Sequence, residues 1–157
     1  MTDPQHDDAW TKLTALAAGD SGLCTLQVYR GDGSAHLSVV NAGPTTHPVS
    51  GLPVVGLVVR GDSHKLRLLR ADARAGVVFR VGWDWIAATG RTELAGPADP
   101  LDGLDAAAIP GLLRDVFTAA GGAHDDWEEY DRVMAAEGRT SVLISVERFS
   151  ANAGTLG

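Results

Sequence analysis

The sequence predicts an α+β protein that is mainly β, an antiparallel barrel with helices appended to it. Most of the predicted strands follow one another directly along the chain, which is typical of antiparallel sheets and not of alternating strand and helix units. A short hairpin signal, Asp32-Gly33, joins the first two strands. The longer amphipathic stretches come late, between residues 109 and 137, where they can cover a finished sheet.

The first half of the chain predicts three strands in a meander. Leu23–Tyr29 mixes β-branched and aromatic residues, and Ala35–Val40 follows it directly after the hairpin turn. Asn41–Pro44 ends the second strand because Gly and Pro interrupt strand pairing. Pro53–Arg60 is nearly all apolar, which predicts a third strand buried on both faces.

A short helix and two further strands are expected next. Ser63 is a suitable N-cap for a helix over His64–Arg70. Ala75–Val81 and Trp85–Leu94 then have the composition of strands, and Gly82–Asp84 forms the bend between them.

The C-terminal part predicts two helices and a closing strand. The first helix carries an apolar stripe at helical spacing, made of Ile109, Leu112, Leu113, Val116, Phe117 and Ala120. Asp125, with Glu128 three residues later, is expected to open the second helix, and Gly138 to end it. Ser141–Arg148 alternates as a final strand.

Length and charge limit the possible partners. The 157 residues, 45% of them hydrophobic, suit one ordinary domain with a single core. A net charge of -7 argues against nucleic acid, whose binding needs clustered positive charge. We expect no membrane partner, because no apolar run approaches the roughly 20 residues of a membrane span. A polar start and one cysteine predict a cytoplasmic protein.

No familiar catalytic or metal-binding motif is present. The chain has no nucleophile elbow, P-loop or dinucleotide-binding glycine pattern. Its five histidines are scattered without the spacing of metal ligands, so no metal site is predicted. They are His6, His36, His47, His64 and His124.

Positive charge is concentrated around the predicted short helix. The basic residues there are Arg60, His64, Lys65, Arg67 and Arg70. A helix N-terminus beside Lys or Arg favours an anion such as phosphate, although a solvated helix face explains the same spacing. Trp83 and Trp85 flank Asp84, where their rings are suited to stacking on a planar molecule, to a dimer contact or to a core role.

Seven stretches resemble the split-barrel flavin and deazaflavin oxidoreductases related to pyridoxamine 5'-phosphate oxidase. They are Ser38–Gly43, Pro53–Arg60, Ser63–Arg70, Arg74–Arg80, Trp83–Trp85, Leu112–Asp126 and Trp127–Glu137. The resemblance extends over most of residues 20–152 and is nearest to the actinobacterial F420-dependent branch. It implies a homodimeric, FMN-binding-like split β-barrel over residues 20–152, preceded by an N-terminal segment (1–19) and followed by a tail (153–157).

The resemblance also implies which residues bind the cofactor. The family's phosphate-binding Ser-Arg-Lys element reads Ser63-His64-Lys65 here, so Lys65 fits the phosphate and His64 replaces an arginine. Arg67 occupies another basic position of the pattern. The remaining positions that the resemblance places beside the cofactor are Ser38, Val39, Val40, Asn41, Ala42, Val58, Arg60 and Trp85.

The implied function is hydride transfer between the reduced deazaflavin coenzyme F420 and a small conjugated organic acceptor. FMN is the alternative cofactor. An FMN-dependent oxidase or reductase and a non-catalytic F420- or haem-binding protein both remain open. No catalytic acid or base is required, because the cofactor supplies the hydride chemistry.

Overall fold

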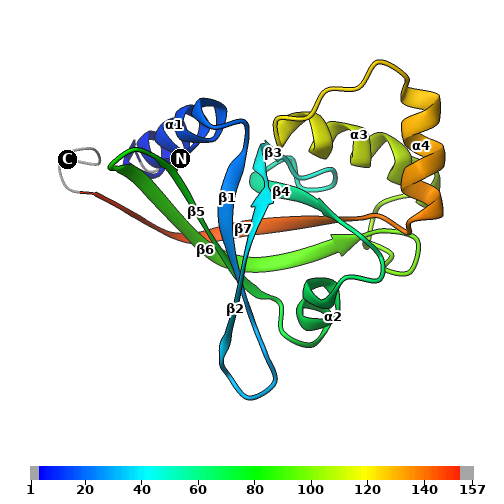
Figure 1. The fold of residues 1–157 in the computed structure, drawn as a ribbon, viewed down its shortest axis with the longest axis horizontal. Coiled ribbons are helices and arrows are strands. Elements are labelled where there is room, and N and C mark those ends of the chain that lie inside the picture. Colours follow the sequence, from blue (N-terminus) through cyan, green and yellow to red (C-terminus); the bar gives the residue numbers. More distant parts are fainter. Residues whose placement is uncertain (1–3, 153–157) are drawn as a thin grey trace.

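The computed structural model describes residues 4–152, which form one antiparallel sheet with helices packed around it (Figure 1). The strands are β1 (Leu23–Tyr29), β2 (Ala35–Asn41), β3 (Gly43–Thr46), β4 (Pro53–Val59), β5 (Arg74–Val81), β6 (Asp84–Ala95) and β7 (Thr140–Ala151). The α-helices within these residues are α1 (Pro4–Gly19), α2 (His64–Ala71), α3 (Ile109–Ala119) and α4 (Trp127–Ala136). A short 3-10 helix, η1 (Ala106–Ala108), precedes α3. The α+β class is confirmed, and none of the described helices is long and apolar enough to cross a membrane.

The order of the strands makes the sheet close on itself. Across the sheet they run β2-β1-β5-β6-β7-β4-β3, with antiparallel pairing throughout. β2 and β3 are at opposite ends of this order, yet only Ala42 separates them in the chain. The sheet must therefore curl until its two ends meet, which gives a barrel-like shape.

Three elements were not predicted from the sequence: α1, β3 and the short helix η1. Residues 1–19 were expected to be only an N-terminal segment, but α1 packs on the barrel through Ala9, Leu13, Leu16 and Ala17. Their helical spacing was an available signal. β3 lies where Pro44 was expected only to break the chain; it is an edge strand, where a residue without an N–H is tolerated.

Smaller corrections concern the C-terminal elements. α4 is capped by Asp126 and not by Asp125: the Asp126 carboxylate accepts a hydrogen bond from the Glu129 N–H at 3.1 Å. β7 runs beyond the expected Arg148 to Ala151, because it pairs with β6 over nearly the whole length of that strand. The cap of α2 is as predicted, with Ser63 accepting from the Leu66 N–H at 3.3 Å.

Buried side chains form two clusters on opposite faces of the sheet. The larger cluster fills the barrel with residues such as Phe79, Ile86 and Ile144, and α1 and α2 cover it. The smaller one lies beneath α3 and contains Leu112 and Val116 together with sheet residues. In Figure 1, α3 and α4 accordingly stand together on one side of the sheet.

The C-terminal end of α3 lies directly on the corner between β2 and β3. A Cβ atom added to Gly43 would overlap the carbonyl oxygen of Ala119, and one added to Gly22 would overlap that of Ala120. The backbone at the end of α3 therefore contacts the backbone of the corner directly, without a side chain between them. Ala42 N–H also donates to the Gly22 carbonyl at 2.8 Å, which ties the corner to the start of β1.

Gly43→Ala is expected to lower the free energy of unfolding by roughly 1–3 kcal/mol or more, because neither backbone segment can move away without opening the corner. Gly111→Ala is the matched control: this glycine lies in α3 with nothing near its Cβ position, so alanine should stabilise the helix by about 0.5–1 kcal/mol. Chemical denaturation measures both values, and equal stability of Gly43→Ala and the wild type would contradict the close contact.

Candidate functional site

A cleft of about 400 Å³ lies between β2, β4 and the two helices α3 and α4. Its walls come from Val40, Asn41, Val58, Phe117, Ala120, Gly121, Gly122, Met134 and Arg139. The lining is mostly apolar, with Asn41 and Arg139 as its polar side chains. The Asn41 amide donates to the Ser21 carbonyl at 2.9 Å and is therefore held at the cleft edge. Such a surface suits a flat, largely apolar group with a few polar atoms.

A group of basic side chains, the basic cluster, lies at the opposite end of β2. It consists of Arg30, His36, His64, Lys65 and Arg67, contributed by the β1–β2 hairpin and by α2. The rings of His36 and His64 meet edge to face with centroids 5.3 Å apart. No carboxylate in residues 4–152 forms an ion pair with any of the five. The cluster is thus a concentration of positive charge with no ion-paired carboxylate in this part of the chain; Asp32 at the hairpin turn acts on Arg30 only through longer-range attraction.

The arginines of the basic cluster determine the state of its histidines. Arg30 Nη2 lies 3.3 Å from His36 Nδ1, and Arg67 Nη2 lies 3.4 Å from His64 Nδ1. Because a guanidinium only donates, each Nδ1 accepts and each neutral imidazole carries its proton on Nε2. Desolvation, together with the charges of Arg30, His64 and Lys65, lowers the pKa of His36 below its usual value. A bound anion would reverse that shift.

Strand β2 connects the basic cluster with the cleft. His36, Ser38 and Val40 alternate along one face and are half-buried, whereas Leu37 and Val39 on the other face are exposed. Ser38 Oγ is buried and has no hydrogen-bond partner in the described part of the chain. From His36 to Val40 the strand rises roughly 13 Å. The inner face of β2 thus carries a basic residue, His36, at one end, the hydroxyl of Ser38 in the middle and the apolar Val40 at the other end.

Several residues expected at the cofactor lie outside both the cleft and the basic cluster. Val39 is 71% exposed on the outer face of β2, and Ala42 is fully buried in the core. The Ser63 hydroxyl is used as the helix cap. Trp85, at the start of β6, donates its backbone N–H to Asn152 Oδ1 at 3.0 Å and does not line the cleft.

Two of the basic residues near α2 are held by carboxylates. Arg60 pairs with Asp62 at 3.2 Å and lies 3.5 Å from Glu137. The Arg60 pairing lowers the pKa of the Asp62 carboxyl. Arg70 makes a two-pronged contact with Asp99, at 2.9 and 2.6 Å. These two arginines therefore do not belong to the basic cluster.

Sequence reasoning missed Arg30 and His36 in the basic cluster and Phe117, Met134 and Arg139 in the cleft. The pairing of Val28 with His36 across the hairpin places Arg30 and His36 at the same end of β2. The Asp32-Gly33 turn signal was sufficient to predict this proximity. Nothing local indicated that α2 would lie beside that end. The cleft residues depend on how α3 and α4 pack, which spacing along the chain does not reveal.

Solved structures resemble this fold over nearly its full length. A conserved hypothetical protein, Rv2991, from Mycobacterium tuberculosis has a TM-score of 0.63 and 18% identity, covering 100% of this chain and 89% of its own. A putative pyridoxamine 5'-phosphate oxidase from Listeria innocua has a TM-score of 0.57 and 12% identity, covering 90% and 96%. A protein described as an F420 reductase has a TM-score of 0.55 and 11% identity, covering 83% and 90%. No protein-family model matches the sequence.

These similarities, together with the closure at Ala42, decide the architecture. The chain has the pyridoxamine 5'-phosphate oxidase-like split-barrel fold. At these identities the likeness concerns the fold alone. Within this split barrel, β2 is the strand at which the sheet turns its corner, and its inner face carries both ends of the candidate site.

Sulfate is expected to bind the basic cluster more tightly as the pH falls from about 8 to about 5.5, by roughly tenfold, because protonation of His36, whose pKa a bound anion raises, adds positive charge. Sulfate keeps its full charge over this range, so the change reports the protein. Calorimetric or NMR titration measures it. His36→Gln should weaken the pH dependence, and Arg148→Ala, an exposed arginine outside the cluster, should leave it unchanged. Equal affinity across the range would contradict the assignment.

Proposed function

We propose that the chain binds coenzyme F420 along β2, with the phosphate at the basic cluster and the ring in the cleft, and uses it in hydride transfer. The observation that carries this proposal is that a cationic cluster without an ion-paired carboxylate in residues 4–152 and an apolar cleft lie along the same strand. F420 has a negatively charged phosphate and a planar ring system, and a flexible polyol chain joins the two. Lys65 and Arg67 would hold the phosphate, and Val40 and Val58 would contact the ring.

The residues present fit such a cofactor. Ser38 Oγ is a buried hydroxyl without a described partner, located between the two ends where the polyol would pass. A buried polar group is expected to find a partner, and a polyol hydroxyl supplies one. The phosphate would supply the basic cluster with an ion-pair partner.

The chain's own contribution to the reaction is orientation and exclusion of water. When bound, reduced F420 supplies a hydride to a conjugated organic acceptor, and a proton from solvent completes the reduction. Phe117 and Met134 would cover the ring on the helix side. Arg139 and Asn41 are the polar groups in the cleft that can orient an acceptor. None of these roles needs a catalytic acid or base.

F420 is favoured over FMN on two grounds. His64 stands where the resembling oxidases have an arginine, which weakens one phosphate contact, and an F420 reductase is among the structures with this fold. FMN-dependent oxidase or reductase activity is the second candidate function, supported by the putative pyridoxamine 5'-phosphate oxidase with the same fold. A protein that carries F420 or haem without turnover is the non-catalytic alternative.

Parallel titration of the purified protein with F420 and with FMN tests the proposal, using the fluorescence of each cofactor as the readout. Tight F420 binding and weak FMN binding are expected. Tighter binding of FMN than of F420 would favour the FMN-dependent function. If the protein binds neither cofactor, the proposed function is wrong. Reduction of a conjugated acceptor by the F420-loaded protein then separates an enzyme from a carrier.

Lys65→Ala should weaken F420 binding by about 1.5–3 kcal/mol, because a charge-assisted hydrogen bond to phosphate is lost. Arg148→Ala, which removes a positive charge from an exposed position of β7 outside the basic cluster, serves as the control and should bind F420 like the wild type. The same titration measures both. If the two variants bind equally well, Lys65 belongs to a solvated helix face.

We also propose that the chain forms a homodimer through the outer face of the sheet. Leu23, Leu37, Val39 and Val78 are exposed apolar residues on β1, β2 and β5. The pairing of Thr25 with both Val39 and Val78 places them on one face. A second copy would cover this apolar face, and a symmetric pair needs only one such surface.

Val39→Asp is expected to convert a dimer to a monomer at micromolar concentration, because two buried carboxylates would face each other across the symmetry axis. Leu52→Asp is the control, since Leu52 is 64% exposed outside this face. Analytical ultracentrifugation or light scattering measures the mass. A monomeric wild type, or a dimer that survives Val39→Asp, would contradict this interface.

A further inference from the structure

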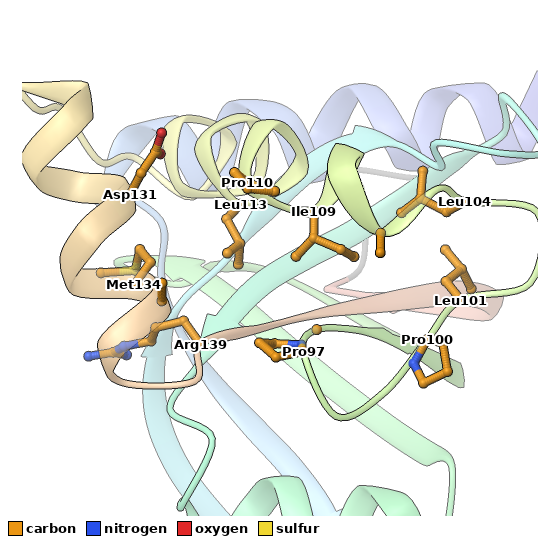
Figure 2. Close-up of a pocket in the computed structure, with 13 residues that line it drawn as sticks. Pro97, Pro100, Leu101, Leu104, Ile109, Pro110, Leu113, Asp131, Met134 and Arg139 are labelled. Carbon is orange, nitrogen blue, oxygen red and sulfur yellow. The ribbon is translucent and has the colours of Figure 1, made fainter.

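A second cavity, the helical pocket, lies on the other side of α4 from the cleft. It has a volume of about 270 Å³ and is bounded by α3, α4 and the segment between β6 and α3. Figure 2 shows Leu101, Leu104 and Ile109 on one side and Met134 on the other. The pocket shares Met134 and Arg139 with the cleft, so these two flexible side chains form the wall between the two spaces.

The helical pocket offers no free charge to a ligand. Asp131 on its rim makes a two-pronged ion pair with Arg114, with Nε to Oδ1 at 2.9 Å and Nη2 to Oδ2 at 2.5 Å. In Figure 2 the guanidinium of Arg139 points away from Pro97 on the opposite wall, so only its aliphatic part lines the pocket. An ionised ligand would lose its hydration here without gaining a partner, so the pocket selects uncharged molecules.

Arg139 combines a neutralised charge with unused hydrogen-bond donors. Its Nε and Nη2 both lie against Glu137 Oε2, at 2.8 and 2.7 Å, and Glu137 also lies 3.5 Å from Arg60. Nη1 donates to no residue of the described chain. Two arginines and two carboxylates, counting Asp62, leave the group uncharged. It therefore suits a carbonyl oxygen better than a second anion.

The wall between the two spaces is able to rearrange. Met134 is unbranched and adopts many conformations at little cost. Behind the wall, Ser141 Oγ is fully buried and has no hydrogen-bond partner within residues 4–152. Ser141 pairs across the sheet with Val58, which lines the cleft. On its other side it pairs with Ala95, which directly precedes Gly96 of the helical pocket.

We propose that the helical pocket holds the apolar body of an uncharged cyclic ketone, whose carbonyl reaches past Met134 to Arg139 in the cleft. This names the class of acceptor and rests on the proposed function for its redox role, whereas the binding itself does not require the cofactor. Arg139 would act as a positioning residue for the carbonyl. An acceptor held in this way would enter the cleft from the α4 side, opposite β2.

Titration of the full chain with α-tetralone, followed by NMR of methionine methyl groups labelled with carbon-13, tests the proposal. The chain has two methionines, Met1 and Met134, and Met134→Leu assigns the signal. We expect a saturable shift of the Met134 methyl. The hydrocarbon tetralin should bind about tenfold more weakly, since it lacks the carbonyl, and the tetralin carboxylate of matched size more weakly still.

Two sets of variants locate the ligand. Ala106→Phe, which fills the pocket, should abolish the shift, whereas Ala107→Phe, at the next position of η1 but outside the lining, should retain it. Arg139→Met should remove the difference between α-tetralone and tetralin, and Arg139→Lys should restore part of it. Equal binding of ketone and hydrocarbon by the wild type would overturn the role of Arg139. Tighter binding of the carboxylate, or an unchanged shift in Ala106→Phe, would overturn the pocket.

Failure of this inference is distinguishable from failure of the proposed function. The methyl signal of Met134 is read without cofactor, and cofactor binding is read from its own fluorescence. F420 binding without a ketone-induced shift would overturn the pocket and leave the cofactor assignment intact. A ketone-induced shift in a protein that binds neither F420 nor FMN would support the pocket and overturn the redox function.

Discussion

The contact of α3 with the corner at Ala42 is the constraint on which the rest of the structure depends. The sheet closes because its two end strands are consecutive in the chain, and α3 can sit on that corner only because Gly22 and Gly43 have no side chains. This contact places α3 over β4 and thereby determines the position of α4, the next helix in the chain. The cleft, the helical pocket and their common wall all result from this one arrangement of backbone segments.

The same closure explains how a small protein can offer a long binding surface. β2 lies at one end of the sheet order, and the residues of its inner face, His36, Ser38 and Val40, are only half-buried. One end of the strand meets α2, which brings the basic side chains together, and the other end meets α3 and α4, which provide apolar walls. Charge and hydrophobicity are separated along a single strand, and that separation is what favours an elongated ligand with a phosphate at one end.

Much of the fold was predictable because its signals are local. The Asp32-Gly33 turn, the Ser63 cap and the α3 stripe each involve residues a few positions apart, and each lies where it was expected. The site was less predictable. Lys65 could be named from the charge pattern and the resemblance, but Arg30 and His36 join it only because a hairpin tip folds next to α2. Arg60 looked equivalent to Lys65 in the sequence, and only the structure places carboxylates beside it.

The most direct test of the account is an experimental structure of the protein with F420 bound. The account predicts the phosphate within hydrogen-bond distance of Lys65 and the His36–His64 pair, the polyol beside Ser38, and the ring against Val40 and Val58. A cofactor bound with its phosphate at Arg60 or Arg70, or with its ring outside the cleft, would contradict the assignment of β2 as the cofactor strand.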